Sequence, residues 1–171
     1  MVSDSPSATP RIEHIPPDGG QHLAVHFETQ TVKVGTEQSA GELLFMATTT
    51  APGKGTPLHT HPVHEYFYIL DGTYEFHALH EGGAETFRAA AGSVVHVPPD
   101  VPHQYTNVTE KTGQMLTLFT PATSMQRFFE AVHVLGTREN EPLIPGTPAY
   151  LAASGELGRA HGLRRVELPS A

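Results

Sequence analysis

Three histidines and one glutamate, His59, His61, Glu65 and His103, have the residue types and the spacing of a metal site. His59 and His61 are two residues apart, so both imidazoles point to the same face of an extended segment. Glu65 follows His61 by four residues, and this even step returns its carboxylate to that face. His103 begins a later strand and must approach from across the fold.

The chemistry of these side chains limits the choice of ion. Imidazole combined with one carboxylate suits Fe, Ni, Mn, Co, Cu or Zn rather than Ca or Mg. The sequence therefore predicts one divalent transition metal ion. Four protein ligands leave a coordination position open to a small molecule if the ion takes more than four ligands, which a closed structural zinc site does not allow.

Two further histidines lie close to the predicted ligands. His64 is adjacent to Glu65 and should face the opposite way, which favours a surface or supporting position, with replacement of Glu65 as a ligand as the alternative. His96 precedes the second part of the site, but its neighbours Val95 and Val97 suit a buried position equally well. The sequence leaves open whether His64 or His96 takes part in the site.

Apolar and aromatic residues near the ligands are expected to line a substrate pocket. Residues at even steps from Glu65 or His103 should point inward with them, and neighbouring strands and a later helix add others. The predicted pocket residues are Phe45, Met46, Phe67, Ile69, Tyr105, Asn107, Met115, Phe119 and Phe128. An apolar cavity with one polar hydroxyl suits a hydrophobic or aromatic small molecule, whereas ordinary core packing is the alternative for each residue taken alone.

Composition excludes several classes of protein. The chain has 171 residues, a length for which a single domain is expected. It has no cysteine, so a metal must be bound by His, Asp and Glu. Its formal charge is −8, without a basic run that could follow a phosphate backbone, so a nucleic acid partner is not expected. A signal-like N-terminus and a long apolar run are both absent from the sequence, so we expect a soluble, cytoplasmic protein without a membrane partner.

Short segments rich in β-branched and aromatic residues follow one another through most of the chain and predict an all-β fold. About nine strands are expected, at 23–27, 31–34, 43–50, 64–70, 73–79, 85–89, 93–97, 103–108 and 114–120. Asp71-Gly72 predicts a hairpin between the fourth and fifth of these strands. Residues 1–10 are expected to form a flexible tail, and 11–171 a single domain with its motifs at 41–120.

Two short helices are predicted in a C-terminal segment at 123–162. Thr123 and Gln126 form a capping box, after which Met125, Phe128, Phe129 and Val132 recur at helical spacing to about Gly136. Thr147-Pro148 predicts the start of a second helix that extends to His161-Gly162, although two internal glycines weaken it.

The ligands belong to two longer motifs, which have fixed internal spacing. The motifs are Gly53-x5-His59-x-His61-x3-Glu65-x6-Gly72 and Gly92-x5-Pro98-x-Asp100-x2-His103-x3-Asn107. Together they resemble the paired motifs of the cupin superfamily, which implies a small jelly-roll β-barrel with the metal inside. Asp100 replaces a glycine of the family pattern, and we expect an intact turn because Asp tolerates the left-handed conformation.

The order of barrel, helix and second helix is similar to that of single-domain quercetinase-like cupins. This resemblance implies a metal-dependent dioxygenase that acts on a small aromatic, flavonol-like or polyketide-like enolisable substrate, with Glu65 as catalytic base as well as ligand. A metal-dependent cyclase or isomerase without oxygen chemistry and a non-enzymatic small-molecule-binding cupin are the alternatives. Exposed strand edges in small barrels are commonly covered by another subunit, so we also expect a homodimer.

Overall fold

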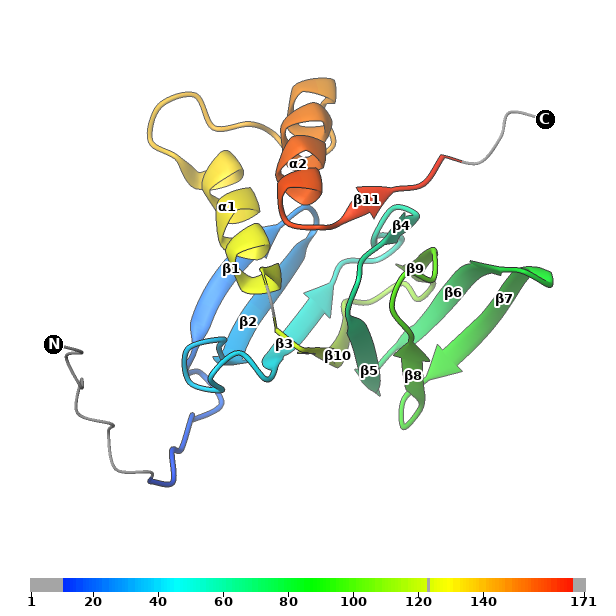
Figure 1. The fold of residues 1–171 in the computed structure, drawn as a ribbon, viewed down its shortest axis with the longest axis horizontal. Coiled ribbons are helices and arrows are strands. Elements are labelled where there is room, and N and C mark those ends of the chain that lie inside the picture. Colours follow the sequence, from blue (N-terminus) through cyan, green and yellow to red (C-terminus); the bar gives the residue numbers. More distant parts are fainter. Residues whose placement is uncertain (1–10, 123, 168–171) are drawn as a thin grey trace, which may run out of the picture.

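The computed structural model describes residues 11–122 and 124–167, in which two antiparallel sheets are accompanied by two helices (Figure 1). The strands are β1 (Gln21–Val25), β2 (Glu28–Val34), β3 (Leu44–Thr50), β4 (His59–Thr60), β5 (His64–Asp71), β6 (Thr73–His80), β7 (Gly83–Ala90), β8 (Val94–Val97), β9 (His103–Asn107), β10 (Gly113–Thr120) and β11 (Arg164–Arg165). One sheet has the order β1-β2-β3-β10-β5-β8 and the other the order β11-β4-β9-β6-β7. The all-β, jelly-roll prediction is confirmed.

Each of the nine predicted strands overlaps an observed one, because segments rich in β-branched and aromatic residues favour extended structure. In β3 and β10, every second side chain is buried against the core. The sequence analysis did not predict β4 and β11, which have two residues each. Such short segments have no periodicity to detect, and they pair with each other only because tertiary folding brings them together.

The predicted hairpin at Asp71-Gly72 is wrong. β5 lies between β10 and β8 in the six-stranded sheet, whereas β6 lies between β9 and β7 in the five-stranded sheet. Gly72 has a φ of +92°, and a Cβ there would lie 3.2 Å from the Cα of Gly113. The dipeptide therefore makes a tight corner from one sheet to the other, since both edges of β5 are already paired with other strands.

The first predicted helix is observed as α1 (Met125–Thr137), and its four predicted apolar residues are all buried. Ser124 is the N-cap residue but makes no side-chain capping hydrogen bond, and Thr123 lies outside the described residues. The Gln126 side chain accepts a hydrogen bond from the backbone N–H of Thr36 and donates one to Glu130. Gln126 thus ties α1 to a loop of the β domain and does not take its predicted part in a capping box.

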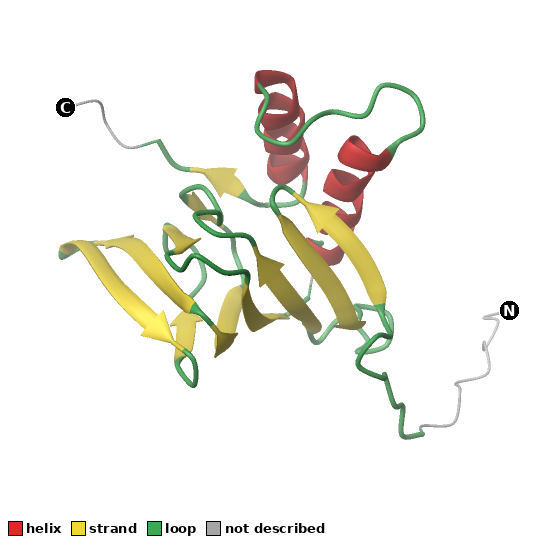
Figure 2. Ribbon diagram, turned by 180° about the vertical axis from the view of Figure 1, so that it is seen from behind, coloured by secondary structure: helices red, strands yellow, loops and turns green. Residues whose placement is uncertain are grey.

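The second predicted helix is confirmed as α2 (Pro148–Ala160). The Thr147 side chain accepts a hydrogen bond from the backbone N–H of Tyr150, and Pro148 occupies the first turn. Both helices stand at the β1 end of the six-stranded sheet (Figures 1 and 2), where α1 contacts β1 and α2 contacts β11. Neither described helix has the length and apolar character needed to cross a membrane.

The core has two apolar clusters. One joins α1 and α2 to β1, β2, β3 and β10 and contains Met46, Phe119 and Phe128. The other lies between the sheets further from the helices and contains Phe67, Met115 and Tyr105. The predicted metal ligands adjoin the first cluster, since the ring of His61 lies 5.6 Å from that of Phe119.

Candidate metal centre

The structure brings the four predicted ligands together. One potential ligand atom from each of His59, His61, Glu65 and His103 lies within 4.8 Å of the others, and all four residues are buried. His59 on β4 is directly opposite His103 on β9, whereas Glu65 comes from β5 in the other sheet. The cluster therefore joins the two sheets and depends on their relative position.

Backbone carbonyl groups orient the three imidazoles. Nδ1 of His59, His61 and His103 lies 2.8, 3.0 and 2.8 Å from the carbonyl oxygens of Pro57, Val63 and Val101, respectively. A carbonyl oxygen only accepts, so each Nδ1 carries a hydrogen, and each neutral imidazole has its Nε2 lone pair free for a metal.

The carboxylate of Glu65 completes a donor set that fits a metal ion. Its Oε2 lies 3.0 Å from Nε2 of both His61 and His103. Each of these two rings thus faces an acceptor at both nitrogens, which a neutral imidazole with one N–H cannot satisfy. A cation among the Nε2 atoms and the carboxylate removes this conflict, so the cluster suits a single divalent metal ion.

Burial and charge shift the pKa values of these residues strongly. Burial by itself raises the pKa of Glu65, but the nearby imidazoles of His103 and His61 outweigh this effect and lower the pKa to about 2. Burial, with the nearby imidazole of His103, lowers the pKa of His59 to about 3. The carboxylate is therefore ionised and His59 is neutral at neutral pH, which are the protonation states that metal binding requires.

Two backbone features hold the ligand segments in place. Asp100 has a φ of +63°, which confirms the predicted left-handed turn, and its N–H donates to the carbonyl oxygen of His61 over 2.8 Å. Gly55 packs against β9, where an added Cβ would meet the carbonyl oxygen of Tyr105. The close approach at Gly55 thus sets the position of the strand that carries His103.

His64 and His96 lie away from the metal cluster. His64 Nδ1 is 2.9 Å from His96 Nε2, and both rings stack with Tyr66 on β5. Alternation along β5 directs His64 and Tyr66 away from the face of Glu65. Among the described residues, the cluster that could hold a metal comprises the four predicted residues without these two.

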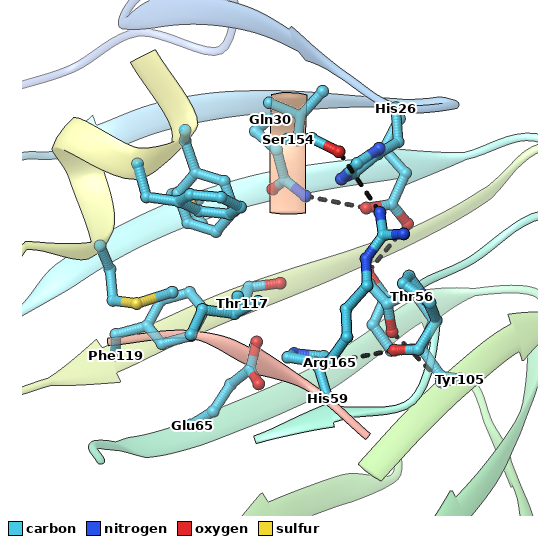
Figure 3. Close-up of a pocket in the computed structure, with 18 residues that line it drawn as sticks. His26, Gln30, Thr56, His59, Glu65, Tyr105, Thr117, Phe119, Ser154 and Arg165 are labelled. Atoms are coloured by element: carbon cyan, nitrogen blue, oxygen red, sulfur yellow. Dashed lines mark hydrogen bonds between the residues drawn. The ribbon is translucent and has the colours of Figure 1, made fainter. Parts of the chain in front are cut away.

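A cavity adjoins the cluster and is shown in Figure 3. His59 and Glu65 form part of its wall, and Met125, Phe128 and Phe129 of α1 contribute to its apolar side. Four of the predicted pocket residues line it, namely Met46, Tyr105, Phe119 and Phe128. The cavity has a volume of about 60 Å³ and is narrow.

The structure places the other five predicted pocket residues elsewhere. Phe45 belongs to the half-buried set on the opposite face of β3 from Met46. Phe67, Ile69 and Met115 are buried in the second core cluster. Asn107 is fully buried, and its side-chain amide donates to the carbonyl oxygens of Thr50 and Lys111. Strand parity indicated an inward direction for Phe67, Ile69 and Asn107, but it does not distinguish the cavity from the packed interior.

A buried polar network in the cavity was not found by the sequence analysis. The Glu28 carboxylate accepts hydrogen bonds from Thr50, Tyr105 and Gln30, and the Gln30 side-chain oxygen accepts another from Thr48. The strand prediction began only at residue 31, so Glu28 and Gln30 fell outside it. Their alternation with Val32, two residues apart on one face, is the signal that could have identified them.

The C-terminal segment reaches the same cavity. β11 pairs with β4, so that Arg165 lies beside His59 in the register. The Arg165 side chain lines the cavity and donates a hydrogen bond of 3.3 Å to Ser154 of α2 (Figure 3). No sequence pattern marked Arg165, because only the pairing of β11 with β4 brings it there.

Comparison with known proteins finds similarity to one domain family in the middle of the chain. Residues 46–119 match the model of the cupin domain family. Auxin-binding protein 1 of Arabidopsis thaliana is 33% identical over 75 residues, which are 41% of this chain and 38% of that protein. The chain thus spans less than half the length of this curated relative.

Solved structures share the fold. The polyketide cyclase RemF from Streptomyces resistomycificus has a TM-score of 0.55 and 16% identity, with 65% of this chain and 80% of that chain covered. An RmlC-like cupin from Shewanella frigidimarina has a TM-score of 0.54 and 18% identity, with 67% and 96% covered. The matching family model, the jelly-roll fold and the buried ligand set together support membership of this chain in the cupin superfamily.

Proposed function

We propose that this protein is a metal-dependent dioxygenase of a small aromatic, flavonol-like or polyketide-like compound that has an enolisable carbonyl group. The observation that carries this proposal is the position of the buried three-histidine, one-glutamate cluster at the wall of a largely apolar cavity. Such a combination binds an organic molecule and places its oxygen atoms beside a metal site.

In this proposal, the cluster holds one divalent transition metal ion. His59, His61 and His103 contribute Nε2 atoms, because their Nδ1 atoms are engaged by backbone carbonyls. Glu65 contributes its carboxylate. When bound, such an ion supplies a Lewis acid that stabilises negative charge on a substrate oxygen.

The cavity wall orients the substrate and excludes water. Phe119, Phe128 and Phe129 offer aromatic surfaces against which a ring can pack, and Met125 adds a flexible apolar side chain. The cavity volume of about 60 Å³ favours a small ligand. A flavonol-sized compound requires lining side chains, such as the exposed Arg165, to move aside.

A cyclase or isomerase without oxygen chemistry is the second candidate, and the Glu28 network favours it. This carboxyl group lies in the cavity but outside the metal cluster, so the site has a second group that can exchange protons. The name of the structural neighbour RemF, a polyketide cyclase, is compatible with this chemistry on the same fold.

The test is oxygen uptake by protein loaded separately with Fe, Ni, Mn, Co, Cu or Zn. Quercetin and the smaller 2′-hydroxyacetophenone serve as substrates, because both have adjacent phenolic and carbonyl oxygens. We expect uptake by the wild type and by Glu81→Gln, an exposed control, but not by Glu65→Gln.

Three other results would redirect the assignment. Absence of uptake with both compounds and every ion would contradict the dioxygenase. Conversion of either compound at the same rate without oxygen would support the cyclase or isomerase. Binding of a compound without conversion, detected by NMR shifts of the protein, would support a non-enzymatic binding cupin.

A further inference from the structure

Glu28 is a buried carboxyl group that metal binding does not explain. It lies on β2 in the six-stranded sheet, is 7% exposed, and lines the cavity together with the ligands His59 and Glu65. Its hydrogen-bond partners are Thr50, Tyr105 and Gln30, which are all neutral. A buried carboxylate without a cationic partner is costly to the folded state, so its position in a cavity points to a chemical role.

The partners hold Glu28 in one orientation. Oε1 accepts hydrogen bonds of 2.8 Å from both the Thr50 and the Tyr105 hydroxyl groups, and Oε2 accepts one of 3.0 Å from Gln30. Thr50 is directly opposite Glu28 on β3, and Thr48 is opposite Gln30 in the same register. The carboxyl group is thus fixed by cross-strand neighbours rather than by a flexible loop.

One oxygen atom of this carboxyl group can accept a further hydrogen bond. A carboxylate oxygen can accept two hydrogen bonds, and Oε1 already accepts two. Among the described residues, Oε2 accepts a hydrogen bond only from Gln30, so it retains one accepting position. Because Glu28 lines the cavity, this position can take a proton from a molecule bound beside the metal cluster.

We propose that Glu28 is the catalytic residue that removes a proton from the substrate and returns it, while Glu65 acts as a metal ligand only. This inference rests on the proposed function for its enolisable substrate. In the step, the C–H bond next to the carbonyl breaks and an O–H bond forms at Oε2 of Glu28. The electron pair of the C–H bond becomes the C=C bond of an enolate, with its charge on the carbonyl oxygen. Return of the proton to carbon restores the carboxylate, so no oxidant or reductant is needed.

The acidity of Glu28 fits this assignment. Burial raises its pKa to about 7, although hydrogen bonds from Thr50, Tyr105 and Gln30 lower it. A group with a pKa near the working pH transfers protons effectively in both directions. The titratable or charged groups that influence Glu28 or share its cavity are Tyr105, Tyr74, Glu65, His59, His26 and Arg165.

The first experiment is deuterium exchange into the methyl group of 2′-hydroxyacetophenone, followed by NMR in D2O under anaerobic conditions with metal-loaded full-length protein. Glu28→Gln should slow the protein-catalysed exchange roughly 100-fold. Glu75→Gln, which removes a surface carboxylate paired with Arg88, should leave the rate unchanged. Glu28→Asp should restore part of the rate and shift its pH profile, which a merely structural role would not do.

The second experiment measures the titration of Glu28 in the metal-loaded protein by NMR of ¹³C-labelled glutamate carboxyl groups. A resonance with a midpoint above that of an ordinary glutamate should be present in the wild type and absent from Glu28→Gln. Elemental analysis should show equal metal content in these two proteins, which separates Glu28 from the ligand Glu65.

The outcomes distinguish this inference from the dioxygenase proposal. Deuterium exchange that depends on Glu28, in a protein that consumes no oxygen, would support Glu28 as the catalytic residue and contradict the proposed dioxygenase activity. Unchanged exchange in Glu28→Gln, no exchange by the wild type, or a Glu28 midpoint below about 5, close to an ordinary glutamate, would overturn the assignment of Glu28.

Discussion

The phenolic hydroxyl of Tyr105 donates a hydrogen bond of 2.8 Å to Oε1 of Glu28. Tyr105 lies on β9, two residues after the ligand His103, whereas Glu28 lies on β2 in the other sheet. This contact therefore connects the strand of a predicted metal ligand to the polar network of the cavity. Its loss should affect the stability of the fold as well as the acidity of Glu28.

Tyr105→Phe should destabilise the protein by about 1 to 2 kcal/mol, because a buried carboxyl group loses one of its donors. The same change should raise the pKa of Glu28 further, since the Tyr105 hydrogen bond lowers it. Urea unfolding measures the free energy of unfolding of each variant. The control Tyr68→Phe, at a side chain that is 43% exposed, should remain within about 0.5 kcal/mol of the wild type. Equal effects of both changes would show that the Tyr105 hydroxyl contributes nothing.

Glu28→Gln should alter the dependence of stability on pH. Between pH 4.5 and about 7, Glu28 keeps its proton in the folded state but loses it in the unfolded state. The folded state binds more protons in this window, so the free energy of unfolding falls as pH rises through it, by up to about 3 kcal/mol.

In Glu28→Gln, the free energy of unfolding should not fall in this way between pH 4.5 and about 7. Urea unfolding of the wild type and the variant across this pH range is the measurement. Burial lowers the pKa of His26 to about 4, which makes stability rise with pH between about 4 and 6.5. His26 is present in both proteins, so its contribution cancels in their difference. A difference that does not vary with pH would contradict the raised pKa of Glu28.

Glu65→Gln should lower metal affinity by about tenfold or more, because a neutral amide replaces the anionic ligand in a set of three imidazoles. Elemental analysis after dialysis against a weak chelator measures the retained metal. Glu81→Gln is the matched control, since it removes a carboxylate from an exposed turn. Full metal retention by Glu65→Gln would exclude the carboxylate as a ligand.

Gly55→Ala should destabilise the protein by about 1 to 3 kcal/mol or more, since the new Cβ collides with the backbone of β9 at Tyr105. The shift of β9 should also weaken metal binding through His103. Gly136→Ala is the control, because its Cβ would meet only the Leu143 carbonyl oxygen at an ordinary distance of 3.8 Å. Within α1, that change should be neutral or stabilising by up to about 1 kcal/mol. Relative to the wild type, the melting temperature should therefore fall in Gly55→Ala and stay the same or rise in Gly136→Ala.

Local sequence patterns were sufficient for much of the fold. Segments rich in β-branched and aromatic residues identified the nine longer strands, and the spacing of Met125, Phe128, Phe129 and Val132 identified the buried face of α1. The Asp71-Gly72 dipeptide predicted a tight turn correctly but not its context. Turn chemistry determines how the chain bends, whereas the pairing of the flanking strands depends on which other strands occupy their edges.

The same division applies to the site. The sequence by itself indicated the four residues of the cluster, because fixed spacing within two motifs places imidazole and carboxylate groups on inward faces of short extended segments. Tertiary structure alone decided the composition of the cavity. Glu28, Arg165 and Phe129 come from segments far apart in the sequence, and they meet only when β2, β11 and α1 pack around the cluster. Periodicity reports which face a side chain occupies, but proximity between distant segments is a property of the packed fold.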